Sequence, residues 1–299
     1  MDFSFFVEVL AGGLLAGVMY SLVALGFVLI YKASGVFNFA QGAMVFFAAL
    51  TFVSLVERGM NAWLALAVTL AAMVVLGMTI ERVVLRPLVN QPPITLFMAT
   101  IGLTFVLEGL SQLAWGSQPH NLELGVPDVP MEWLSQQWNI NISQFDLFAA
   151  LVAGVLVGVL AVFFQKTRIG RALRAVADDH QAALAVGIPL QHIWTIVWGV
   201  AGFVALVAGL MWGARNGVQY SLTFVALKAL PVLLIGGFES IPGAILGGLI
   251  IGATEKLAEV YLGPMVGGGI ESWFAYVVAL LFLLVRPEGM FGEKHIDRV

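Results

Sequence analysis

The chain has 299 residues, of which 60% are apolar and 11% charged, and its mean hydropathy is +0.97. Soluble domains usually carry about 25% charged residues, so this composition excludes a soluble domain and predicts a chain solvated by lipid. The net charge of -4 is too small to indicate a nucleic-acid partner, and the lack of cysteine excludes disulfides, thiolate catalysis and cysteine-ligated metals.

Membrane-length apolar segments recur along the whole chain. A bilayer core about 30 Å thick needs roughly 20 apolar residues in a helix. The sequence predicts an all-α polytopic membrane protein with about eight or nine transmembrane helices, near 6–30, 39–56, 62–80, 93–114, 145–164, 193–214, 222–238, 243–258 and 271–285. The segment after Phe37 and the pair around Pro242 are short and rich in glycine. These segments are either full crossings or re-entrant or broken helices.

Lysine and arginine indicate the orientation, because they concentrate in cytoplasmic loops. Basic residues mark the loop with Arg82 and Arg86, the segment 165–192 and the C-terminal tail, which we expect to be cytoplasmic. The loop 115–145 has neither residue type, so we expect it to be external. Nine crossings place the N-terminus outside and the C-terminus inside. With eight crossings, one short segment is re-entrant and one of the two termini lies on the opposite side of the membrane.

The segment 165–192 contains a polar helical insert, GRALRAVADDHQAALAVGIP, between two predicted spans. Its apolar residues recur at roughly helical spacing, so that one face can dock while the charged face is wet. The helix is expected to end at Gly187, because proline follows at 189 and cannot continue a helix. The insert is either a solvated connector on the membrane surface or a helix that binds a separate motor subunit.

Polar side chains within the spans are candidates for a translocation path. Asn38 and Gln41 precede a short helix at membrane depth, where Asn38 either lines the path or caps that helix. Lys228 and Glu108 lie inside predicted spans, where ionisable groups are costly. Both could face a water-filled path, where they could pair with each other. The structural alternative is that Lys228 snorkels or interacts with carbonyl groups and that Glu108 lies near the outer interface.

Two patterns point to repeated architecture and close packing. Tyr20-Ser21-Leu22 recurs as Tyr220-Ser221-Leu222, a weak internal echo that would place a pathway between two halves. Glycines four residues apart, Gly243 with Gly247 and Gly248 with Gly252, allow helix backbones to approach closely.

Three separated motifs resemble those of the LivH-type permease subunits of ABC importers for branched-chain and other hydrophobic amino acids. They are GLLAGVMYSLVALGFVLIYKASGVFNFAQGAM at 13–44, AALAVGIP at 182–189 and ALKALPVLLIGGFESIPGAILGGLIIG at 226–252. The second is similar to the loop that seats permeases on their ATPase subunits, except that Gln181 stands in place of its leading glutamate. The family also has relatives for urea, amides and small carboxylates, so the substrate stays open.

The resemblance implies one permease domain over 1–299 in the bacterial inner membrane. Its expected partners are a second, LivM-type permease, two ATPase subunits and an external binding protein. It implies coupling to the ATPase through Arg171, Arg174, Asp178, Asp179, Ala182, Ala183 and Gly187, and a path near Tyr20, Asn38, Gln41, Lys228 and Glu108.

No G-x-x-x-x-G-K-[ST] loop occurs, so we expect no enzymatic activity, no bound cofactor or metal, and ATP use by the partner subunits. One rival function is a stand-alone channel or secondary transporter, which would work without ATP. The other is an intramembrane enzyme, which would need paired carboxylates or a histidine cluster within the spans.

Overall fold

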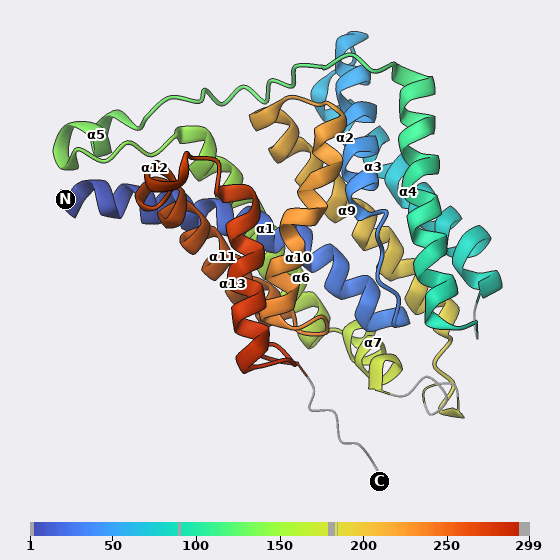
Figure 1. Cartoon of the computed structure of the whole chain (residues 1–299). Coiled ribbons are helices and arrows are strands. Elements are labelled where there is room, and N and C mark those ends of the chain that lie inside the picture. Colours follow the sequence, from blue (N-terminus) through green and yellow to red (C-terminus); the bar gives the residue numbers. More distant parts are fainter. Residues whose placement is uncertain (1–2, 89–90, 179–182, 184, 293–299) are drawn as a thin grey trace. The chain divides into compact units, whose positions relative to one another are not determined.

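The computed structural model describes residues 3–88, 91–178, 183 and 185–292 (Figure 1). These residues form helices joined by loops, which confirms the all-α prediction. The elements in chain order are α1 (Phe3–Ser34), α2 (Gln41–Glu57), α3 (Ala62–Thr79), the π-helix η1 (Ile80–Leu85), η2 (Arg86–Leu88), α4 (Pro93–Trp115), α5 (Glu132–Trp138), α6 (Gln144–Lys166), α7 (Arg168–Asp178), α9 (Leu190–Asn216), the 3-10 helix η3 (Tyr220–Phe224), α10 (Val225–Gly236), α11 (Ile241–Tyr261), α12 (Gly263–Val266) and α13 (Glu271–Val285).

Six of the described helices are long and apolar enough to cross a membrane. Three further apolar helices are shorter, at Gln41–Glu57, Tyr220–Gly236 and Glu271–Val285. The predicted short segment after Phe37 is therefore one of these three. Of the pair around Pro242, the first helix is short, but α11 has 21 residues and is long enough to cross.

Local sequence signals explain several helix ends. The Asn61 side chain accepts a hydrogen bond from the backbone N–H of Trp63 and caps α3. Ser240 caps α11 in the same way, with its hydroxyl accepting from Gly243 N–H over 3.0 Å. After α1, Gly35 has a φ of 65°, a conformation that glycine adopts without steric cost.

The chain divides into two compact units, and the described residues of unit 1 lie in 3–25, 125–158 and 227–292. Within unit 1, α1 and α11 pack at backbone distance. A Cβ placed on Gly17 would lie 2.5 Å from the carbonyl oxygen of Gly248, and one on Gly252 would lie 2.3 Å from that of Gly13. The expected close approach at the glycine pairs of α11 is therefore confirmed. Helix α13 packs on α11 in the same unit.

Unit 2 contains the described residues of 26–124 and 159–226. Its centre is α9, which contacts α2 and α3, and α2 also contacts α4 and η3 (Figure 1). Glycines again set the spacing, because a Cβ on Gly77 would lie 2.5 Å from the carbonyl oxygen of Trp198. Two hydrogen bonds fasten the start of α9, from Trp194 Nε1 to the Ala33 carbonyl and from Thr195 Oγ1 to Glu81.

Candidate functional site

A buried, non-helical turn joins α1 to α2 in unit 2. Asn38 Oδ1 accepts from the backbone N–H of Ala40 over 3.1 Å, and Asn38 Nδ2 donates to Gln41 Oε1 over 3.2 Å. Both side chains are fully buried. Asn38 thus accepts from a backbone N–H just ahead of α2, which resembles the capping role that was its alternative. A role of Asn38 and Gln41 in the path stays a prediction.

The same hydrogen bonds fix the orientation of the Gln41 amide. Because its Oε1 faces Asn38, its Nε2 points away, and this buried nitrogen has no hydrogen-bond partner in the described part of the chain. A Cβ on Gly26 would lie 2.6 Å from this nitrogen, so the amide could keep this position only with glycine there. An unpaired buried donor costs about 1–3 kcal/mol.

Glu108 of α4 and Tyr220 of η3 form a second polar pair in unit 2. The Tyr220 hydroxyl donates to Glu108 Oε2 over 3.3 Å. Glu108 is 7% exposed, whereas Tyr220 is 45% exposed and has its ring edge-on to Phe46 and Phe224. Residues 217–219 separate α9 from η3, and η3 continues directly into α10.

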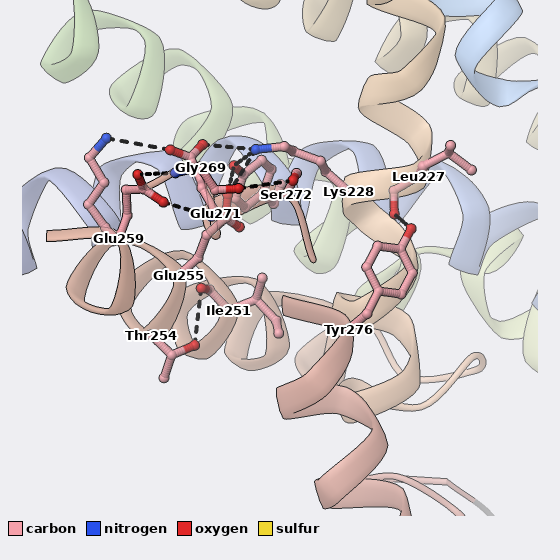
Figure 2. Close-up of polar contacts among 12 residues, drawn as sticks. Leu227, Lys228, Ile251, Thr254, Glu255, Glu259, Gly269, Glu271, Ser272 and Tyr276 are labelled. Atoms are coloured by element: carbon pink, nitrogen blue, oxygen red, sulfur yellow. Dashed lines mark hydrogen bonds and ion pairs between the residues drawn. The ribbon is translucent and has the colours of Figure 1, made fainter. Parts of the chain in front are cut away.

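Lys228 lies in a network of ion pairs in unit 1 (Figure 2). Its Nζ donates to Glu255 Oε1 over 2.8 Å, to Glu271 Oε1 over 2.9 Å and to the Tyr20 hydroxyl over 3.4 Å. Tyr20 also donates to Glu255 over 3.1 Å, and the Lys228 ammonium lies 5.7 Å from the centre of the Tyr20 ring. Three acceptors use all three donors of an ammonium group, so Lys228 is satisfied within the protein.

The acidic residues of this network position the start of α13. Glu259 of α11 accepts from the backbone N–H groups of Gly269 and Glu271, over 2.8 Å in each case (Figure 2). Glu271 Oε2 also lies 3.9 Å from Lys256 Nζ. Helices α1, α10, α11 and α13 are therefore joined by charge-assisted hydrogen bonds. No group of three His, Cys, Asp or Glu side chains among the described residues is arranged to hold a metal ion.

The predicted coupling segment begins with α7, an amphipathic helix. Leu173 and Val176 are buried, and α7 contacts α9. Arg174 donates to the carbonyl oxygens of Phe164 and Gln165 over 2.6 and 3.1 Å, and Arg171 donates to that of Lys166 over 3.3 Å. Both arginines thus bind the last carbonyls of α6, where cations stabilise a helix end.

The other predicted coupling residues differ in exposure. Asp178 ends α7, whereas Asp179 and Ala182 lie outside the described residues. Ala183 is buried, whereas Gly187 is exposed and has a φ of 83°. Next to it, Val186 exposes 76% of its surface. Among the described residues of the segment, Val186 and Gly187 form an exposed turn, which we call the tip; its role in coupling stays a prediction.

Several partners of the predicted residues escaped sequence reasoning. Glu255 and Glu271 bind Lys228 in unit 1, and Tyr220 binds Glu108 in unit 2. The possible pairing of Lys228 with Glu108 stays a prediction. The buried Glu81, bound to Arg86 at 2.9 Å, was also missed. The sequence feature that could have identified these partners is the presence of carboxylates inside apolar segments, because such groups require partners.

Comparisons with known proteins show the family of the chain. A family model described as the branched-chain amino acid transport system permease component matches residues 9–286. The permease protein LivH of the high-affinity branched-chain amino acid transport system of Escherichia coli is 28% identical over 100% of this chain and 99% of its own. BraD, the corresponding permease protein of Pseudomonas aeruginosa, is 28% identical over 98% of both chains.

A more distant relative has a different cargo in its name. The fructose import permease protein FruF of Bifidobacterium longum is 26% identical over 90% of this chain and 75% of its own. The family model spans nearly the whole chain, including most of α1, the predicted coupling segment and the Lys228 network. The chain belongs to the family of permease components of branched-chain amino acid transport systems.

Proposed function

We propose that the chain is the membrane-spanning permease subunit of an ATP-driven importer that carries branched-chain or other hydrophobic amino acids across the bacterial inner membrane. The observation that supports this most directly is the match of the family model to residues 9–286, together with full-length relatives named as branched-chain amino acid permeases. The apolar helices supply the membrane domain that such a permease requires.

Energy for transport would come from other polypeptides. The sequence contains no loop of the phosphate-binding type, so ATP would be used by two separate ATPase subunits. A second permease of LivM type would complete the membrane domain, and an external protein would deliver the solute. The chain itself would then act as a transporter component without enzymatic activity, cofactor or metal.

Two parts of unit 2 would serve transport in this assembly. The segment 165–192 would bind an ATPase subunit through the exposed tip at Val186 and Gly187, while Arg171 and Arg174 hold α7 against α6. The path would run near Asn38, Gln41 and Glu108, which are buried polar groups in apolar surroundings. Tyr20 and Lys228 would support the path by fixing helices of unit 1.

The chemical class of the transported solute has an alternative. LivH and BraD are named for branched-chain amino acids and FruF for fructose, so one architecture accommodates solutes of different chemistry. A urea, amide or small-carboxylate importer with the same subunits is therefore the alternative function. A stand-alone channel or secondary transporter is the alternative that would need no ATPase.

The test is to purify the chain from its native membrane in mild detergent and identify the subunits that accompany it. Wild type is compared with Val186→Asp, which puts a charge on the exposed tip, and with Val129→Asp, a matched change in the loop 115–145. We expect ATPase subunits with wild type and Val129→Asp, and about tenfold less with Val186→Asp because a buried unpaired charge is costly at an interface.

Each result has a distinct meaning. If Val186→Asp retains its ATPase subunits, the tip is not the coupling contact, although the permease proposal stands. If wild type purifies alone and still moves leucine into liposomes without ATP, the stand-alone transporter replaces the proposal.

A further inference from the structure

Glu108 is a buried carboxylate without a cationic partner among the described residues. It lies in the apolar helix α4 and is 7% exposed. Its hydrogen bond comes from the Tyr220 hydroxyl, and no lysine, arginine or histidine of the described chain forms an ion pair with it. A carboxylate at membrane depth is costly unless a cation compensates its charge.

The aromatic side chains around Tyr220 favour a cation at the same place. The Tyr220 ring centre is 6.5 Å from that of Phe46 and 5.6 Å from that of Phe224, with both pairs nearly perpendicular. Tyr220 and Phe224 expose 45% and 50% of their surface, so the described chain does not cover the cluster completely. Aromatic faces attract an ammonium group within about 6 Å of the ring centre.

Unit 1 contains the same tyrosine–glutamate pair with its cation. The Tyr20 hydroxyl donates to Glu255, as the Tyr220 hydroxyl donates to Glu108. The Lys228 ammonium completes the first pair, at 2.8 Å from the carboxylate and 5.7 Å from the ring centre. The two tyrosines also occupy equivalent places in the repeated Tyr-Ser-Leu motif.

We infer that Glu108 and Tyr220, with Phe46 and Phe224, bind the primary ammonium group of the transported solute. The ammonium would donate to the Glu108 carboxylate and lie against the Tyr220 ring, in the arrangement that Lys228 adopts in unit 1. This rests on the proposed function, because it names the group by which the path recognises its cargo. It favours a zwitterionic amino acid over urea, an amide or a sugar, none of which carries an ammonium group.

The test measures binding of small probes to the assembled importer, purified without its external binding protein and placed in phosphatidylcholine nanodiscs. Isopentylamine carries the ammonium group, isopentanol is its neutral counterpart, and isocaproate carries only the carboxylate. We expect wild type to bind isopentylamine about tenfold or more tightly than isopentanol, as a charge-assisted hydrogen bond would provide. Glu108→Gln should abolish this preference.

Further variants separate binding from folding. Tyr220→Phe keeps the ring but removes the hydroxyl, so it should retain part of the preference, whereas Tyr220→Leu should lose most of it. Leu110→Ala, on the exposed face of α4 two residues from Glu108, is the matched control and should bind as wild type does. Thermal unfolding of each variant shows whether the fold is intact.

The outcomes distinguish the inference from the function on which it rests. Equal binding of amine and alcohol by wild type, or an unchanged preference in Glu108→Gln, would overturn the inference even if leucine uptake still requires ATP. Repeating the titration with phosphatidylethanolamine tests whether a lipid headgroup supplies the ammonium. Competition by this lipid would keep the ammonium site but remove its role in cargo recognition.

Discussion

At the scale of single residues, Lys228 shows how a charge can be accommodated inside a membrane protein. Its ammonium donates to Glu255, Glu271 and Tyr20, and the Glu255 side chain is only 3% exposed. The lysine therefore compensates a buried carboxylate, and its donors are not free for a solute. From the sequence, the structural alternative for Lys228 was an interaction with backbone carbonyl groups. In the structure its partners are instead two carboxylates and a hydroxyl.

Removing the Lys228 charge should destabilise the protein. Lys228→Met leaves Glu255 buried without its cation, and breaking a buried ion pair costs about 3–5 kcal/mol. Because Lys228 is partly exposed, we expect a loss of about 3 kcal/mol in the free energy of unfolding, and partial recovery in the double variant Lys228→Met/Glu255→Gln. Unfolding in detergent measures both. A Lys228→Met protein with wild-type stability but no transport would instead place Lys228 in the path.

At the scale of helices, glycine spacing determines how closely α1 and α11 pack. Gly13 and Gly17 of α1 face Gly252 and Gly248 of α11 at distances that leave no room for a Cβ. In a bilayer, close packing and hydrogen bonds drive helix association more than hydrophobic burial does. The Ser21 hydroxyl adds a hydrogen bond to the carbonyl of Ile245 over 3.2 Å. The contact between these two helices thus depends on small side chains.

Adjacent glycines in α1 provide a matched test of this packing. A Cβ on Gly13 would lie 2.6 Å from the carbonyl oxygen of Gly252, whereas one on Gly12 would meet nothing within 4 Å. Gly13→Ala should therefore destabilise the protein by about 1–3 kcal/mol, as overpacking does. Gly12→Ala should be neutral or stabilise it by up to about 1 kcal/mol, because alanine favours the helix. Equal effects in thermal unfolding would contradict the backbone contact.

At the scale of the whole molecule, the sequence predicted where helices lie better than which side chains meet. Predicted and observed bounds agree closely at 62–80 and α3, and at 271–285 and α13, because each apolar run is bounded by polar or loop-forming residues that end the helix. The partners of Lys228 and Glu108 come from helices 27 to 208 residues away in the chain, and their choice depends on how each helix is rotated. Hydropathy does not record that rotation.

The same limit applies to the coupling segment and to the number of domains. Arg171 and Arg174 suggested a free charged face, but they bind carbonyls at the end of α6, a contact that depends on the turn between α6 and α7. The expectation of one permease domain over 1–299 stays a prediction beside the two compact units. The internal echo of Tyr-Ser-Leu, in contrast, coincides with two tyrosine–glutamate pairs.

The orientation of the whole chain in the membrane can be measured directly, because the natural sequence contains no cysteine. Single cysteines replace Phe3, Val129, Val186 and Phe291, which are 80%, 47%, 76% and 48% exposed. If all nine apolar helices found among the described residues cross, a membrane-impermeant maleimide should label the cysteines at 3 and 129 in intact spheroplasts. Those at 186 and 291 should react only after permeabilisation, because basic segments stay inside. Labelling of positions 3 and 291 from the same side would mean an even number of crossings, with one of the three short helices re-entrant.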